Sequence, residues 1–398
     1  MAVSTVQTNN KLVKYTQQIN REWVRENMFS PYMGEDINSI IRRRMELKSG
    51  GEQINIPLVT RLRGQGVSTG PLVGFEDEID DYGMRVWVEW ARNAVVTKKS
   101  EMQKDSADTF GEAKPLLSDW LQEVTRDEII AGLMALPTES QPAAGTRVNG
   151  IQYDLATATQ RGQWQLDNSD RVLFGAAVSN QIVTPGTVAT NHANSLLNVD
   201  TTADKLTAAS LSLLKRVAMN ADPRIRPYKT RDGYEYYVCF AGLSSFRDLK
   251  LDLAVVNKDA RPREGRQVNG APDNPLFQDG DQIYDGVIVR LVPEISRFVG
   301  TTANPGPWGV PSGGNLLLAG AASARVEPVF LCGQQAAAIA YAQMAKPTFR
   351  QEDDYQFIKG VGIEAAYGVA KMFKKHPKAG TALKQWGVVT GFFASASD

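Results

Sequence analysis

The stretch GGEQINIPLVTRLRGQGVSTGPLVGFEDEIDDYGMRVWVEWARNAVV, residues 50–96, contains two runs in which apolar and polar residues alternate. The first run covers residues 53–62 and places on one face Ile54, Ile56, Leu58 and Leu62. The second covers residues 84–91 and places on one face Met84, Val86, Val88 and Trp90. A period of two is typical of a strand with one buried face. We therefore predict two strands that pair as a long β-hairpin.

The segment that joins the two runs is much longer than a tight hairpin turn requires. It combines a glycine-rich part, RGQGVSTG at 63–70, with an acidic part, EDEIDD at 76–81. A compact domain rarely keeps an excursion of this length without a partner, and a two-stranded ribbon alone in water is only marginally stable. We therefore expect the apolar face and the free edges of the hairpin to be buried against a neighbouring subunit.

Charged and aromatic residues of the hairpin are candidates for that contact. Basic residues precede the tip and acidic residues follow it, so a head-to-tail contact between subunits would bring opposite charges together. The alternative is that these residues form only a solvated surface. The candidates are Arg61, Arg63, Glu76, Asp77, Glu78, Asp80, Asp81, Trp87 and Trp90.

The composition of the 398-residue chain, 42% hydrophobic and 22% charged, is that of folded globular material. Lysine plus arginine and aspartate plus glutamate each total 44, a balance that argues against wrapping nucleic acid by bulk charge. Cys239 and Cys332 lie in apolar runs and are predicted to be buried thiols in a reducing compartment. Because we find neither a signal-peptide core nor an apolar run of about 18 residues, we expect a soluble protein made in the cytoplasm.

Residue patterns for catalysis or metal binding are scarce. The two histidines, His192 and His376, lie in polar segments that we interpret as solvated loops. The motifs HExxH, GxSxG and DxDxDG are absent, and RGQGVSTG lacks the GK[ST] ending of a phosphate-binding loop. The acidic runs at 76–81 and 351–356 match no calcium loop and are interpreted as solvated or intersubunit patches. We therefore expect no enzyme activity, no cofactor and no metal site.

The remaining segments predict a mixed α+β fold. Two amphipathic helices are expected at 11–33 and 36–51. The strongest helical periodicity follows Gly111 and predicts a helix of more than about 20 residues that ends before Pro137. Residues 138–204 are interpreted as irregular with short strands. Later segments predict helices at 206–220 and 243–256, strands at 234–242 and 286–293, and a strand running into a helix at 326–343.

The order of these parts resembles the HK97-type fold of tailed-phage major capsid proteins: an N-terminal arm, a long two-stranded extension, a long helix and a mixed domain to which late strands return. Several segments also resemble the phage N4-type major capsid family, in the right order. They are NSDRVLFGAA (168–177), NPLFQDGDQIYDGVIVRLVPEI (274–295), VEPVFLCGQQAAAIAYAQ (326–343), DDYQFIKGVGIEAAYGVAKMF (353–373) and WGVVTGFFA (386–394). The resemblance covers most of residues 50–394, except for the excursion at 257–282 and the NPGPWGVPSGG loop at 304–314.

The resemblance implies an N-terminal arm at 1–49, an extended β-hairpin loop at 50–99, a peripheral domain with the long spine helix at 100–205 and 346–398, and an axial domain at 206–345. It implies a major capsid protein of the virion that self-assembles into hexamers and pentamers of an icosahedral phage head around packaged double-stranded DNA. Implied partners are other copies of the chain, a scaffolding protein, a portal and a cement or decoration protein, with weak non-specific contact to DNA and no membrane. An encapsulin-like compartment shell of the same fold is the alternative.

The resemblance also raises the question of how subunits would interlock. No lysine lies between Lys48 and Lys98, so the covalent crosslinking through a loop lysine seen in some relatives of this fold has no nucleophile here. Arm and loop are therefore expected to interlock noncovalently, in the cytoplasm of the host bacterium. The glycines Gly64, Gly66, Gly70 and Gly74 would let the loop bend differently in hexamers and pentamers. Because we see no long charged helical extension at the N-terminus, we expect a separate scaffolding protein and an uncleaved chain.

Overall fold

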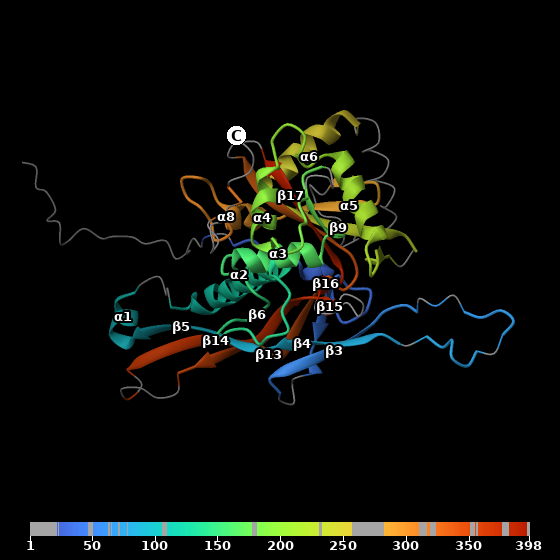
Figure 1. Cartoon of the computed structure of the whole chain (residues 1–398). Coiled ribbons are helices and arrows are strands. Elements are labelled where there is room, and N and C mark those ends of the chain that lie inside the picture. Colours follow the sequence, from blue (N-terminus) through green and yellow to red (C-terminus); the bar gives the residue numbers. More distant parts are fainter. Residues whose placement is uncertain are drawn as a thin grey trace, which may run out of the picture.

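A computed structural model of the chain is built around two β-sheets that share one continuous core (Figure 1). The structure describes residues 22, 24–46, 51–62, 64, 66–70, 72–77, 79–105, 110–176, 181–230, 233–256, 282–309, 317–318, 324–350, 355, 357–375 and 382–395.

The six-stranded sheet crosses the lower part of the molecule in Figure 1 and contains its longest strands. Its order is β1 (Met33–Gly34), β2 (Ile41–Arg44), β13 (Ala337–Phe349), β14 (Ile358–Lys371) and β5 (Glu89–Lys98), and β6 (Val148–Asn149) also pairs with β14. Helix α2 (Ala113–Met134) packs against β14 through buried residues that include Leu121, Ile130 and Leu133. It has 22 residues, about 33 Å at about 1.5 Å per residue, which confirms the predicted long helix.

The seven-stranded sheet lies in the upper part of the molecule (Figure 1). Its order is β10 (Gln282–Tyr284), β11 (Val287–Leu291), β9 (Glu235–Ala241), β12 (Arg325–Cys332), β17 (Val388–Ser395) and β7 (Val172–Phe174), and β8 (Tyr228–Lys229) pairs with β9. Successive residues of β9 enter different cores: Cys239 packs with residues of α5 (Ala208–Asn220) and α6 (Leu243–Val256), whereas Phe240 packs with the N-terminal arm. The sheet is therefore covered on both faces.

The predicted elements of the second half are largely confirmed. Helices α5 and α6 and strands β9 and β11 occupy the segments expected for them. Cys239 and Cys332 are free, fully buried thiols, as predicted. The other described helices are α1 (Lys99–Lys104), α3 (Ala158–Asp167), α4 (Val188–Leu197), α8 (Pro293–Val299) and the 3₁₀ turn Ser30–Tyr32. Two further pairs of strands, β3 (Gln53–Val59) with β4 (Asp81–Trp87) and β15 (Phe373–Lys375) with β16 (Leu383–Gln385), lie outside the two large sheets.

The predicted transition from strand to helix at 326–343 is wrong, because β12 is followed by a second strand, β13. The alanine-rich sequence favours a helix, but its alternate residues are buried on opposite faces of the six-stranded sheet. Ala337 and Ile339 join the main core, while Ala338 and Ala340 face the hairpin. Burial on both faces removes the polar alternation that marks a strand, so tertiary packing overrides the helix propensity.

The N-terminal arm also differs from the prediction. Residues 11–21 and 23 lie outside the described residues, but the helix expected at 11–33 is wrong for its second half, where 24–33 contain irregular chain, the 3₁₀ turn and the start of β1. The helix expected at 36–51 is also wrong, because Ile41–Arg44 form β2, parallel to β13. The arm is anchored in its own chain: Phe29 is fully buried with its ring 4.9 Å from that of Phe240, and Tyr32 accepts a hydrogen bond of 2.9 Å from Arg290.

Residues 138–204, predicted to be irregular, contain α3 and α4 as well as the short strands β6 and β7. Helix α3 begins with a capping box in which Thr157 and Gln160 bond each other's backbone N–H groups. Two of its polar residues, Arg161 and Gln165, are buried and form hydrogen bonds; for example, Gln165 donates to Ser195 Oγ of α4 at 2.6 Å. Polar residues inside the core hide the apolar stripe by which an amphipathic helix is recognised in a sequence.

The interpretation of His192 as a solvated loop residue is wrong, and His376 lies outside the described residues. His192 is fully buried in α4, where its Nε2 lies 2.8 Å from the hydroxyl of Tyr153. The rings of Trp164, Phe174 and Phe392 surround it at 5.5 to 6.0 Å. Burial, assisted by the charge of Arg161, lowers the pKa of His192 to about 3.

This buried histidine predicts a pH-dependent stability. The unfolded chain binds a proton at His192 below about pH 6.5, whereas the folded chain binds it only near pH 3. The free energy of unfolding should therefore fall as pH drops through this window, by roughly 1.4 kcal/mol per pH unit from this residue. The free energy of unfolding of the unassembled chain can be measured by urea denaturation at several pH values. It should depend less steeply on pH in His192→Phe than in the wild type; parallel pH profiles would contradict the assignment.

Candidate assembly site

The predicted hairpin is present, but its second run is divided between two sheets. Strands β3 (Gln53–Val59) and β4 (Asp81–Trp87) pair antiparallel, from Gln53 opposite Trp87 to Val59 opposite Asp81. After Val88 the chain continues as β5, which pairs with β14 in the six-stranded sheet. Figure 1 shows the loop beyond β3 and β4 projecting from the right side of the molecule.

The apolar face of the paired strands is buried within its own chain. The hairpin contributes Ile54, Ile56, Leu58, Met84 and Val86, which pack on Ala338, Ala340, Ala370, Met372 and Phe373. Each large side chain buried in this way contributes roughly 1.5 to 3 kcal/mol. The expectation that this face waits for a neighbouring subunit is therefore wrong for the paired strands. Leu62, predicted on the same face, is 61% exposed because β3 ends at Val59.

The base of the hairpin is held by the side chain of Asn149. Its Oδ1 accepts from the backbone N–H of Trp87 at 2.9 Å, and its Nδ2 donates to the Trp87 carbonyl at 2.9 Å. A Cβ at position 368 would overlap that same carbonyl oxygen, so Gly368 of β14 is what allows the backbone of Trp87 to lie this close to the sheet. Trp87 is half-buried and lines two adjoining cavities of about 390 and 450 Å³, while Trp90 is half-exposed beside it.

The point where the loop leaves the body, which we call the neck, consists of Thr60, Asp80 and Lys374. The backbone N–H of Thr60 donates to the Asp80 carbonyl at 3.1 Å, and its hydroxyl donates to the Asp80 carboxylate at 2.7 Å. Lys374, on β15 (Phe373–Lys375), is 2% exposed and forms an ion pair with Asp80. Asp80, a candidate for contacts between subunits, is thus engaged within its own chain.

A second carboxylate lies beside the neck. Glu139 accepts a hydrogen bond of 3.0 Å from the hydroxyl of Tyr82 and pairs with Lys375 at 3.3 Å. Burial, followed by the charge of Glu139, raises the pKa of Tyr82 above its usual value, so this hydroxyl keeps its proton. The ring of Phe373 lies 6.1 Å from that of Tyr82. The three consecutive residues of β15 therefore contact Tyr82 of β4, the other two residues of the neck, and Glu139, respectively.

Beyond the neck, the tip (residues 61–79) exposes apolar side chains. Five of them are 60% to 83% exposed, namely Leu62, Leu72, Val73, Phe75 and Ile79. The carboxylate of Glu76 accepts from the N–H of Gly74 at 2.6 Å, and that of Asp77 accepts from the N–H of Gly64. Two further candidates are exposed: Arg61 in the tip and Asp81 at the start of β4. Arg63 and Glu78 lie outside the described residues.

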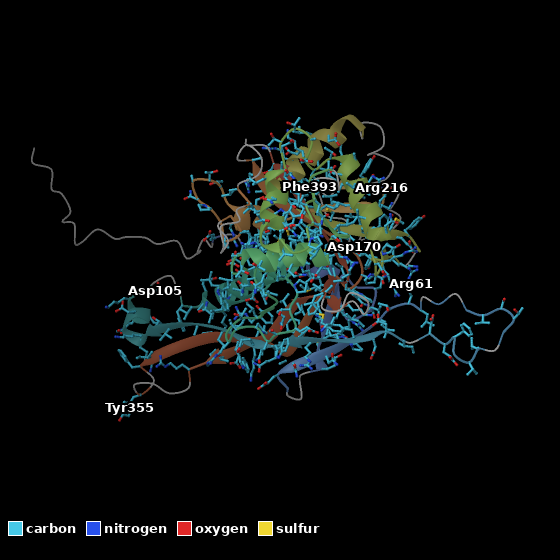
Figure 2. The ribbon with its side chains drawn as sticks, in the orientation of Figure 1. Arg61, Asp105, Asp170, Arg216, Tyr355 and Phe393 are labelled. Carbon is cyan, nitrogen blue, oxygen red and sulfur yellow. The ribbon has the colours of Figure 1, made fainter. Side chains whose placement is uncertain are left out.

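The opposite end of the molecule carries a groove at the far ends of β13 and β14. We call it the far-end groove; it has a volume of about 580 Å³ and is lined by Phe110, Gly111, Lys114, Phe349, Arg350, Ile358, Lys359, Gly360 and Val361. The ammonium of Lys114 lies 5.0 Å from the centre of the Phe349 ring, and that ring is 59% exposed. Figure 2 shows Arg61 on one side of the molecule and Asp105 and Tyr355 on the other. Residues 351–354 lie outside the described part of the chain.

The residues that anchor the hairpin were missed by sequence reasoning. Asn149, Glu139, Lys374 and Lys375 lie far along the chain from the strands that they hold. The only local signal of an anchor was that two lysines, Lys374 and Lys375, directly follow the buried residues Met372 and Phe373. No pattern in the sequence indicates the residues with which these lysines pair.

The described residues contain neither a cluster of metal ligands nor a membrane-spanning helix. Histidine, cysteine, aspartate and glutamate side chains in this part of the chain nowhere form a group of three that could hold a metal ion. Within the same residues, no helix is both long and apolar enough to cross a membrane.

Comparison with known proteins identifies relatives over the whole chain. A model of a family described as phage capsid protein matches residues 4–392. The cyanophage Pam1 capsid asymmetric unit is 33% identical, with 100% of both chains covered and a TM-score of 0.80. The capsid of Ralstonia phage GP4 is 16% identical, with 100% of this chain and 99% of that chain covered and a TM-score of 0.69. The acidic stable capsid of Helicobacter pylori bacteriophage KHP30 is 13% identical, with 99% of each chain covered and a TM-score of 0.62. No curated protein sequence matches.

Two isoleucines of the hairpin allow a matched test of this geometry. Ile56 is fully buried on the six-stranded sheet, whereas Ile79 is 72% exposed in the tip. Ile56→Ala should lower the free energy of unfolding of the unassembled chain by about 2 to 4 kcal/mol. Ile79→Ala should change it by less than about 0.5 kcal/mol. Chemical denaturation of both variants checks this; equal effects would show that the hairpin face is not buried within the subunit.

Proposed function

The chain belongs to the phage capsid protein family, and from this premise we propose that its copies join head to tail into hexamers and pentamers through the tip and the far-end groove. It is a major capsid protein with the HK97-type fold: a structural protein of the virion that forms the icosahedral head of a tailed phage, and not an enzyme. The relatives found are phage capsids, which does not favour an encapsulin-like compartment.

One observation supports the head-to-tail arrangement. The same subunit presents complementary surfaces at its two ends: an apolar tip with acidic residues at one end, and an apolar groove with basic residues at the other. A contact between two different surfaces of identical subunits generates a ring when the rotation closes. Each tip would then cover exposed apolar residues of the next subunit, such as Phe349, while its own Phe75 and Ile79 leave water.

Opposite charges would set the register of this contact. We assign Glu76, Asp77 and Asp81 to the side of the tip, and Lys114, Arg350 and Lys359 to the groove of the neighbour. Charge pairs at the rim of an interface contribute more to register and to association rate than to affinity. Trp87 and Trp90, at the base of the hairpin, would contact a second neighbouring subunit through the cavity of about 450 Å³ that they both line.

The remaining assignments follow the resemblance to the HK97-type fold. The arm is residues 1–49, the extended loop 50–99, the peripheral domain 100–205 with 346–398, and the axial domain 206–345. The partners are a scaffolding protein, a portal and a cement or decoration protein, and assembly takes place in the cytoplasm of the host bacterium. The balance of 44 basic and 44 acidic residues supports only weak, non-specific contact with packaged double-stranded DNA.

Charge reversal and rescue test the contact. Glu76→Lys with Asp77→Lys should lower the yield of closed shells several-fold, because the reversed tip repels the basic groove. Adding Lys114→Glu and Lys359→Glu should restore the yield to within about twofold of the wild type, which a merely misfolded tip would not allow. The yield is measured by sedimentation and electron microscopy after expression with the neighbouring phage genes.

Lys229→Glu is the control for this experiment, because it reverses an exposed charge on β8, outside the two surfaces. It should leave the yield unchanged. The proposal is contradicted if the reversed tip still assembles normally, or if the reversed groove fails to rescue it.

The loop should not form covalent crosslinks between subunits, because residues 49–97 contain no lysine to act as a nucleophile. On a denaturing gel, mature particles should release this protein as a single band at 43.6 kDa. A ladder of higher oligomers that maps to peptides of this loop would overturn the expectation of noncovalent interlocking.

A further inference from the structure

We propose that Lys374 and Lys375 fix the direction in which the extended loop leaves the subunit, so that the paired strands β3 and β4 keep one orientation in every copy. Any difference between hexamer and pentamer subunits is then confined to the tip, residues 61–79. The inference rests on the proposed function, because it concerns how one chain fits both kinds of ring.

The neck resists movement because Lys374 is buried. Its side chain is 2% exposed, and its ammonium lies 3.3 Å from the hydroxyl of Thr60 in addition to forming the ion pair with Asp80. If the hairpin swung away, Asp80 would leave with it and the ammonium would remain buried without its counter-charge. An uncompensated buried charge is among the most unfavourable changes in a protein interior.

Lys375 adds a second, more exposed attachment on the adjacent residue. It holds Glu139, which in turn accepts the hydrogen bond from Tyr82 of β4. Glu139 closely follows the end of α2, so this contact ties β4 to the long helix as well as to β15. Two successive side chains of one strand thus restrain both translation and rotation of the hairpin.

Below the neck, the paired strands have little freedom. Their apolar face is buried on Ala338, Ala340 and Ala370, and a hinge at Val88 would break both hydrogen bonds between Asn149 and the backbone of Trp87. Beyond the neck the situation reverses. Gly66 and Gly74 have φ of +68° and +91°, with open space around the position of a Cβ, so the tip contains points at which it can bend.

The direct experiment is a map of the assembled shell at a resolution that shows side chains. When all independent subunits are superposed on β13 and β14, β3 and β4 should coincide and the contact between Asp80 and Lys374 should persist in hexamers and pentamers, with differences only in residues 61–79. A hairpin that rotates about Val88 between subunits, with the neck broken in some of them, would overturn the inference.

A variant experiment tests whether the neck controls particle geometry. Lys374→Met removes the buried charge, and the matched control is Lys384→Met, since Lys384 is the cross-strand partner of Lys374 and pairs with Asp170 at 3.3 Å. We expect the fraction of tubes and wrongly sized particles to rise several-fold in the first variant and to stay at the wild-type level in the second. Lys374→Arg, which keeps the charge, should restore uniform particles if the effect is one of positioning.

The outcomes separate the two proposals. Shells of normal size from Lys374→Met would refute the role of the neck and leave the head-to-tail contact standing. If maps of uniform wild-type particles show that the tip does not contact the far-end groove of the next subunit, the head-to-tail contact is refuted instead. If Lys374→Met does not yield folded protein, the map of the wild-type shell decides the question by itself.

Discussion

The extended hairpin depends on one contact, the packing of its apolar face on small residues of the six-stranded sheet. Ala338, Ala340 and Ala370 leave room for Ile56 and Met84, so the hairpin lies close against β13 and β14 as a second layer. This burial makes a long protrusion compatible with a folded subunit, because a free two-stranded ribbon would be marginal in water. The loop can therefore carry exposed apolar residues only beyond the neck.

Strand β13 and the N-terminal arm connect the two sheets of the molecule. The chain passes from β12 of the seven-stranded sheet into β13 within a few residues, and the N-terminal arm bridges both sheets. Phe29 and Tyr32 of the arm pack on Phe240, while Ile41 of β2 pairs beside Ala337. The base of the loop and the core of the seven-stranded sheet are therefore connected through a single packed core.

Much of the fold was predictable from local patterns. The alternation in β3, the periodicity of α2 and the apolar runs of β9 and β11 all predicted the correct elements, because each has a solvated face or a characteristic length. Helices α3 and α4 escaped prediction because residues such as Gln165 and His192 are polar yet buried. Strand β13 escaped it because its first residues are rich in alanine and buried on both faces, and the arm because its partners lie more than 200 residues away.

By itself, the sequence determined that this chain has a long hairpin loop with an acidic tip, an α+β body and the ordered segments that resemble a phage capsid protein. Only the tertiary structure decided which surfaces are left for other subunits. It buried the apolar face of the hairpin internally, engaged Asp80 with Lys374 and left the tip and the far-end groove exposed at opposite ends. The reason is that alternation shows that a face will be buried, whereas its partner is set by contacts between residues distant in sequence.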